Sequence, residues 1–191
     1  SKLLLDCGLY QGRRADTYER NLNFRYDPKT VDAVILSHAH IDHAGNLPNL
    51  TKQGYEGLIY ATRATADLGS LMIRDSGRIQ ESDAEFVNKK RARRGEEPIK
   101  PLYTEQDAEE VAGMFKGVDY VEAFEPIPGV IARFYEAGHI LGSAGVSLEI
   151  EEKGKKIRLW FSGDIGRYQL PLLRDPVLPE AADYMIMEST Y

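Results

Sequence analysis

The chain has very little cysteine, and this limits both its covalent chemistry and the compartment that suits it. Cys7 is the only cysteine among 191 residues, so an intrachain disulfide is impossible. A single thiol fits a reducing compartment, and we therefore expect a cytoplasmic protein. Cys7 lies between Asp6 and Gly8 at a predicted strand end, where a small buried residue is the more common role than a metal or redox role.

Long apolar runs are absent too. No stretch approaches the roughly 18 consecutive apolar residues of a membrane-spanning helix, so we expect no membrane association. The chain does not open with the charged, apolar and small-residue segments of a signal peptide. Residues 1–6 instead resemble the middle of a strand, which fits a natural N-terminus further upstream.

The chain has fewer basic than acidic residues, 24 against 30, and its net charge is −6. Proteins that grip nucleic acid over a broad surface are usually basic, so any nucleic-acid role here must depend on a local site. One local run is basic, and it comprises Lys89, Lys90, Arg91, Arg93 and Arg94. Its simplest interpretation is a solvated helix face, with a local binding site as the alternative.

Short apolar runs alternate with polar, turn-rich segments, which predicts one layered α/β domain. We expect strands at residues 2–7, 31–36, 57–61, 130–136, 145–151, 156–161 and 184–187, the last of them buried, with a hairpin turn at 153–155. Helices are expected at 46–55 and at about 62–90. A further helix should begin after Thr104, with Asp107 completing a capping box and with Val111, Met114 and Phe115 on one face.

Three of the four histidines occur in the hexapeptide His38-Ala39-His40-Ile41-Asp42-His43. In extended backbone, residues two apart point to the same side, so His38 and His40 can face one cation. If a helix begins near Asp42, then Asp42 and His43 can face a second cation close by. Imidazole and carboxylate ligands without thiolate favour a catalytic zinc site, with iron or manganese as alternatives. A cluster of capping and core polar residues is the competing interpretation.

Two further residues extend this set. His139 lies between glycines after a predicted strand, and Asp164 follows another predicted strand. Alone, each has an ordinary explanation, a hydrogen-bonded structural histidine and a turn aspartate. Beside the hexapeptide, their positions at strand ends indicate metal ligands.

These residues, in this order and together with the strand end Asp6-Cys7-Gly8, resemble the ordered motifs of the metallo-β-lactamase superfamily across nearly the whole chain. The resemblance implies a four-layer αββα sandwich, incomplete at both ends, with two zinc ions at one edge of the sheets. It implies that His38, His40 and His139 bind one ion and that Asp42 and His43 bind the other. Asp164 would bridge the two ions. Asp6 would not bind metal but would hold the histidine loop in shape.

The segments 138–144 and 187–191 resemble the β-CASP branch, which contains RNA nucleases such as relatives of the pre-mRNA 3′-processing endonuclease subunit. The resemblance to a prokaryotic member implies that residues 1–191 are the N-terminal part of the metallo-β-lactamase core. A β-CASP domain is expected after residue 191. Glu188 would be a catalytic residue that orients a histidine beyond this chain, and a solvated carboxylate at a strand end is the alternative.

The implied activity is endo- or exonucleolytic cleavage of single-stranded RNA by a hydroxide that two metal ions activate and Asp42 positions. The 191-residue span alone is expected to be nearly inactive, because a ligand histidine and a proton donor would lie outside it. Two alternatives stay open: a thioester or lactam hydrolase similar to hydroxyacylglutathione hydrolase, and a scaffold paralogue without activity. A homodimer is a further open prediction.

Overall fold

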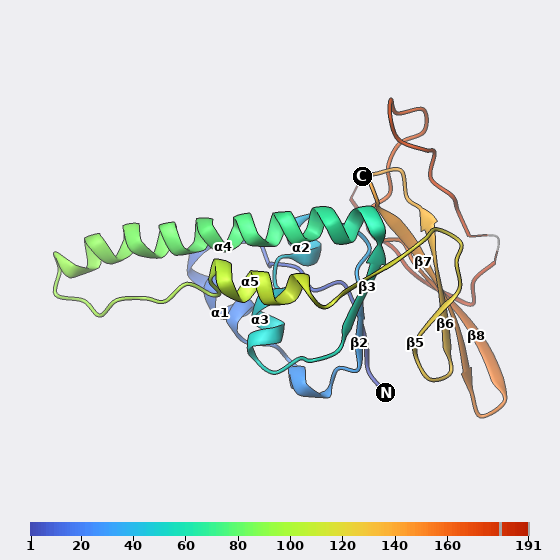
Figure 1. Ribbon diagram of the computed structural model, residues 1–191, viewed down its shortest axis with the longest axis horizontal. Helices are drawn as coiled ribbons and strands as arrows, with labels where there is room; N and C mark the ends of the chain where they lie inside the picture. Colours follow the sequence, from blue (N-terminus) through green and yellow to red (C-terminus); the bar gives the residue numbers. More distant parts are fainter. Residues whose placement is uncertain (180, 191) are drawn as a thin grey trace.

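The computed structural model describes residues 1–179 and 181–190. Two β-sheets face each other, and helices cover the outer face of the first sheet (Figure 1). This arrangement confirms the predicted α/β class and the predicted sandwich. Among the described residues the helices lie on one outer face alone, so three of the four expected layers are present.

The first sheet is parallel throughout and has the order β1-β2-β3-β4. Its strands are β1 (Leu3–Leu5), β2 (Ala33–Ile35), β3 (Leu58–Thr62) and β4 (Phe115–Val118). Parallel strands need crossover connections, and the helices of the chain supply them. They are α1 (Arg14–Leu22), the 3-10 helix η1 (Pro28–Thr30), α2 (Ile41–Ala44), α3 (Leu47–Lys52), α4 (Arg63–Ala92) and α5 (Glu105–Ala112).

The second sheet has the order β5-β6-β7-β8-β9, antiparallel except for the last pair. Its strands are β5 (Phe124–Ile127), β6 (Val130–Glu136), β7 (Ala144–Glu152), β8 (Lys155–Phe161) and β9 (Tyr184–Ile186). The predicted hairpin between β7 and β8 is confirmed. Lys153 and Gly154 both have positive φ there, as a tight turn between antiparallel strands requires.

Strand β2 explains the nearly continuous apolar run at residues 31–36. Val34 and Leu36 pack toward the helices, whereas Ala33 and Ile35 pack toward the second sheet. Both faces of this strand are therefore buried, so the usual alternation of polar and apolar residues is lost. The two resulting cores fix the strand end that leads into the histidine hexapeptide.

The helices largely follow the sequence pattern. Thr104 and Asp107 form the predicted capping box at the start of α5. The predicted placement of Met114 and Phe115 on that helix was wrong, because α5 ends at Ala112, Met114 lies in the following turn and Phe115 begins β4. No helix within 1–179 or 181–190 is long and apolar enough to cross a membrane.

The expectation that residues 184–187 form a buried strand was also wrong. Strand β9 forms, but Tyr184 is 62% exposed and Ile186 is 49% exposed. The reason is position, since β9 stands at the edge of its sheet and β8 is its one pairing partner among the described residues. An apolar run alone does not distinguish an uncovered edge strand from a buried central one.

Candidate metal centre

The predicted ligands come together because they all follow strand ends on one side of the sandwich. His38 and His40 lie just after β2, and the backbone stays extended at His40 before α2 begins. His139 lies in the loop between β6 and β7, and Asp164 lies after β8. Loops beyond strand ends are where open α/β sheets commonly place their ligand sites.

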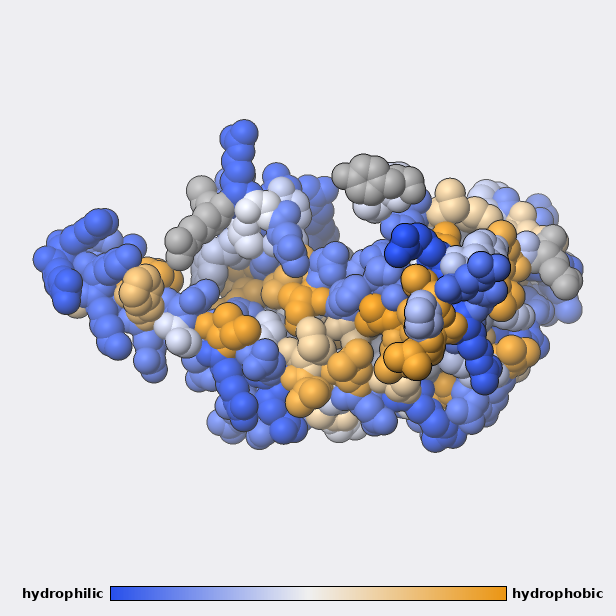
Figure 2. Space-filling view, turned by 90° about the horizontal axis from the view of Figure 1, so that it is seen from above, coloured by the Kyte–Doolittle hydropathy of each residue, from blue (hydrophilic) through white to orange (hydrophobic). Residues whose placement is uncertain are grey.

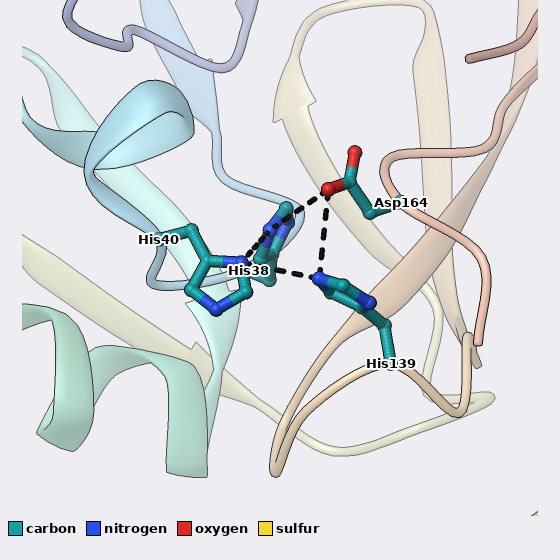
Figure 3. Close-up of side chains that lie close together, drawn as sticks. All are labelled: His38, His40, His139 and Asp164. Atoms are coloured by element: carbon teal, nitrogen blue, oxygen red, sulfur yellow. Dashed lines mark hydrogen bonds and ion pairs between the residues drawn. The ribbon is translucent and has the colours of Figure 1, made fainter. Parts of the chain in front are cut away.

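His38, His40, His139 and Asp164 point toward one another (Figure 3). His40 Nδ1 lies 3.0 Å from His38 Nε2 and 3.1 Å from His139 Nε2. Asp164 Oδ2 lies 3.7 Å from His38 Nε2 and 3.5 Å from His139 Nε2. The four atoms thus converge on a common centre from three separate loops.

These separations fit a metal ion, and the two from His40 Nδ1 are also short enough for hydrogen bonds. Four ligands at about 2.0–2.1 Å around a tetrahedral zinc ion lie roughly 3.3 Å apart, close to the distances found here. Burial, together with the adjacent His43, His40 and His139, lowers the pKa of His38 to about 2. Burial and then the charge of His139 also lower the pKa of His40. Neutral imidazoles offer lone pairs to a cation, so the donor set suits one.

A second group adjoins the first and shares Asp164 with it. Asp164 Oδ1 lies 3.2 Å from His43 Nε2, while its other oxygen faces His38 and His139. Asp42 Oδ2 lies 3.9 Å from His43 Nε2, and the Asp42 side chain is 53% exposed. The structure therefore places Asp164 between the two groups and leaves Asp42 open to solvent.

Asp6 and Ser37 hydrogen-bond to the sides of the histidine rings that face away from the cluster centre. Asp6 accepts hydrogen bonds from Ser37 N and from Ser37 Oγ, each at 2.7 Å. Asp6 Oδ2 also lies 2.6 Å from His43 Nδ1, too close for two ligands of one ion and right for a short hydrogen bond. Burial alone would lower the pKa of His43. The hydrogen bond and charge of Asp6, followed by the charges of Asp164 and Asp42, together have a larger effect, and the net pKa is raised. A donating Nδ1–H leaves Nε2 of His43 free to face a cation.

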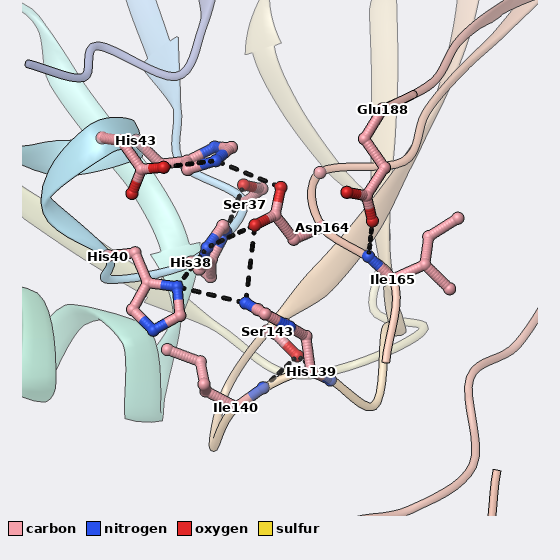
Figure 4. A network of polar contacts seen from close by, with 12 residues as sticks. Ser37, His38, His40, His43, His139, Ile140, Ser143, Asp164, Ile165 and Glu188 are labelled. Carbon is pink, nitrogen blue, oxygen red and sulfur yellow. Dashed lines mark hydrogen bonds and ion pairs between the residues drawn. The ribbon is translucent and has the colours of Figure 1, made fainter. Parts of the chain in front are cut away.

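Two serines were missed by the sequence reasoning. Ser37 Oγ lies 3.0 Å from His38 Nδ1, so a hydroxyl that donates to Asp6 can accept from His38 and leave its Nε2 free. Ser143 Oγ accepts from His139 N at 3.0 Å and from Ile140 N at 3.2 Å, which shapes the His139 loop (Figure 4). The available signal was position, since Ser37 directly precedes the hexapeptide and Ser143 closes a glycine-flanked turn.

Glu188 lies beside the Asp164 loop and does not join the histidine cluster (Figure 4). Its carboxylate accepts from Ile165 N at 2.5 Å, and its own backbone N–H donates to Ser162 Oγ at 3.1 Å. Both contacts tie the end of β9 to the residues on either side of Asp164. Tyr191, the last residue of the motif at 187–191, lies outside the described residues.

Cys7 and Gly8 lock the histidine loop onto β1. Cys7 N donates to His43 O at 2.7 Å, and the thiol is buried, so burial followed by the charge of Asp6 raises its pKa. A Cβ on Gly8 would lie 1.5 Å from Asp42 O and 2.6 Å from His43 N. The strand and the metal-binding turn are therefore in backbone contact at a point where glycine alone fits.

We expect Gly8→Ala to destabilise the fold by about 1–3 kcal/mol, because the added carbon must push the Asp42 backbone away. Denaturant unfolding monitored by circular dichroism measures this. Gly113→Ala is the matched control, since its Cβ would meet nothing nearer than Glu110 O at 3.6 Å and its backbone is right-handed helical. Equal stability losses in the two variants would contradict the proposed contact.

Comparison with known proteins places this geometry in context. Residues 1–176 match the family model described as the metallo-beta-lactamase superfamily. The chain is 35% identical over 190 residues to Ribonuclease TTHA0252 of Thermus thermophilus, covering 100% of this chain and 38% of that protein. It is 29% identical over 193 residues to cleavage and polyadenylation specificity factor subunit 3-I of Arabidopsis thaliana, covering 98% of this chain and 24% of that protein.

Among solved structures, the fold is similar to Zn(2+)-bound PqqB from Methylobacterium extorquens, with a TM-score of 0.52 and 19% sequence identity. That match covers 98% of this chain and 56% of the other. At this identity the likeness concerns the fold alone. The chain spans well under half the length of both sequence relatives named above.

Proposed function

The chain belongs to the metallo-beta-lactamase superfamily, and on that premise we propose that it is the metal-binding core of a ribonuclease. The main support is a coincidence of two observations. The chain is similar to proteins named as a ribonuclease and a cleavage and polyadenylation specificity factor, and three of its histidines meet Asp164 in one cluster, with His43 directly beside it. The proposed substrate is single-stranded RNA, cut by hydrolysis of a phosphodiester bond.

We propose two zinc ions as the native cofactors, with iron or manganese as alternatives. His38, His40 and His139 would hold one ion, Asp42 and His43 would hold the other, and Asp164 would contact both. When bound, two such ions polarise a phosphoryl group and make water a stronger nucleophile. The shared position of Asp164, with one oxygen toward each group, supports this assignment.

The remaining roles fall to protein groups. Asp42 would position the attacking water, and its exposed carboxylate is accessible from solvent as that role requires. Asp6 hydrogen-bonds to Nδ1 of His43, and Ser37 hydrogen-bonds to Nδ1 of His38. The Nε2 atom of each ring therefore points away from these partners. All four histidines of the chain are assigned to metal, so a proton donor for the leaving oxygen must come from elsewhere.

We propose that this donor belongs to a β-CASP domain following residue 191, toward which Glu188 would orient a histidine. Two observations support a longer chain: the relatives named above are far longer, and β9 exposes apolar side chains. We also propose a cytoplasmic location, which agrees with a single, buried cysteine.

The substrate class is tested by a side-by-side assay of the full-length protein, including the β-CASP domain proposed to follow residue 191, on a single-stranded RNA and on a glutathione thioester. We expect RNA cleavage that stops when a chelator removes the metal, and thioester hydrolysis at least about 100-fold slower in kcat/KM. The reverse preference would favour the thioester hydrolase. Bound metal without either activity would favour a scaffold role.

A further inference from the structure

One groove of the molecule lies apart from the candidate metal ligands. It has a volume of about 920 Å³ and lies between α1, the distal half of α4 and the segment 96–102 that returns along α4. Helix α4 has 30 residues, roughly 45 Å of length at 1.5 Å per residue. Its far end projects beyond α1, α3 and α5 (Figure 1). The proposed chemistry uses none of this surface.

The wall of the groove is fixed by hydrogen bonds. The Asn88 side chain donates to Ile99 O at 2.9 Å and accepts from Ile99 N at 2.8 Å. Arg91 Nε donates to Glu97 O at 2.6 Å, and Arg91 also pairs with Glu96 at 3.0 Å. The returning segment is thus held against α4, so the groove is a built feature of the fold.

The groove combines exposed aromatic rings with cations. Tyr18 on α1 is 44% exposed and Phe86 on α4 is 57% exposed, and both line it. Lys90 Nζ lies 4.3 Å above the centre of the Phe86 ring. Four basic residues and two acidic ones line the groove, in a protein whose net charge is −6. Figure 2 shows the hydrophilic tip at the left, with apolar side chains between it and the body of the molecule.

The inner end of the groove adjoins the metal-binding loop. Leu9 is one of its lining residues, and Leu9 N donates to Ile41 O at 2.9 Å. Ile41 stands between the candidate ligands His40 and Asp42. A strand lying in the groove would therefore lead from the tip of α4 to the edge of the metal centre.

We propose that this groove binds a single-stranded stretch of the RNA substrate, away from the bond that is cut. The inference rests on the proposed ribonuclease function. Sites for single-stranded nucleic acid combine a cationic groove for the backbone with aromatic rings on which bases stack, and both features occur here. The basic run at residues 89–94, otherwise explained as a solvated helix face, would contact RNA phosphates at the mouth of the groove. A polypeptide occupant would need no excess of positive charge.

The test uses Lys90→Glu/Lys100→Glu, because both lysines line the groove and no ion pair to either is found among the described residues. Lys116→Glu/Lys155→Glu is the matched control, since it changes the net charge equally at exposed lysines outside the groove. Fluorescence anisotropy with a labelled 24-nucleotide single-stranded RNA, in EDTA to prevent cleavage, gives Kd at several salt concentrations. We expect the groove variant to bind about tenfold more weakly and to lower the salt slope by about 1.4, for two lost phosphate contacts. The control should stay within about twofold.

Phe86 tests the stacking separately. Phe86→Leu should weaken binding of the 24-nucleotide RNA by about tenfold, whereas Phe86→Tyr should restore it, because a ring and not mere apolar bulk is needed. Cleavage of a 6-nucleotide RNA, too short to occupy both sites, should change less than about twofold. Unchanged Kd values, or equal losses in the groove and control variants, would overturn the proposal, and unchanged values are also the result expected if a polypeptide fills the groove. Full-length wild-type protein that binds RNA through the groove but cuts neither RNA would instead contradict the proposed function.

Discussion

In the full-length protein, Asp164→Asn is expected to reduce RNA cleavage by more than about 100-fold while leaving the fold intact. The carboxylate has one oxygen facing His38 and His139 and the other oxygen facing His43. An asparagine of the same shape keeps a single oxygen and turns N–H donors toward the other group. One of the two groups must then lose a ligand and gain a repulsive contact with any cation. Loss of groups that merely support a metal ligand typically costs 10–100-fold, so the loss of a shared ligand should cost more.

Two measurements separate this effect from unfolding. Elemental analysis should find fewer than two metal ions per chain in the variant. The Asp164 side chain is 24% exposed, so a substitution of equal size should change the free energy of unfolding by no more than about 1 kcal/mol. Asp75→Asn, at an exposed aspartate on α4, is the control for removing one negative charge. A variant that kept two ions and wild-type kcat would show that Asp164 is not a shared ligand.

The local order of the sequence was enough to predict which loops bring the candidate ligands together. Spacing of two places His38 and His40 on one side of extended backbone, and the helix expected near Asp42 begins at Ile41. His139 and Asp164 were predicted from their positions after strands, and the structure brings both within 4 Å of His38 or His40. His139 and Asp164 follow β6 and β8, which run in the same direction on either side of the antiparallel β7, so both lie at one edge of the second sheet. The packing of the two sheets then brings this edge to the end of β2, and the sequence order alone does not specify that packing.

Details that depend on contacts between distant segments could not be predicted. Asp6 and His43 are 37 residues apart, and which oxygen or ring nitrogen meets which partner follows from three-dimensional packing. Ser37 and Ser143 look like ordinary turn residues until their hydroxyls are seen against His38 and the His139 loop. The groove beside Phe86 depends on the return of segment 96–102 along α4, and no periodic pattern in the sequence indicates that path.

The second large effect is expected at Asp6, whose proposed role is to position His43 and not to bind metal or substrate. Asp6→Asn should weaken metal binding and RNA cleavage by roughly 10–100-fold. The backbone at Asp6 has φ of 60°, a left-handed conformation that asparagine tolerates well, so the change is confined to the side chain. In the wild type, Asp6 Oδ1 accepts from Ser37 N, while Oδ2 contacts both Ser37 Oγ and His43 Nδ1.

An asparagine amide can satisfy one of these two sides but not both, since its nitrogen only donates. If the NH₂ group faces His43, the ring must present an unprotonated Nδ1, and its proton moves to Nε2. That proton would block the nitrogen that faces Asp164 Oδ1 at 3.2 Å. The second group of ligands should therefore lose affinity more than the first, and a zinc titration should resolve the two losses.

Asp6→Gly is a second test of the Asp6 contacts, and Asp27→Asn is the control. Glycine accepts the positive φ but removes all three contacts, so its activity should fall at least as far as that of Asp6→Asn. Asp27 also accepts a hydrogen bond from a backbone N–H, that of Lys29 at 3.1 Å, but it lies at the start of η1 and outside the ligand cluster. Asp27→Asn should therefore leave both zinc affinities and kcat within about twofold of the wild type. If Asp6→Asn bound both ions as tightly as the wild type, neither the orientation of His43 nor its metal affinity would depend on Asp6.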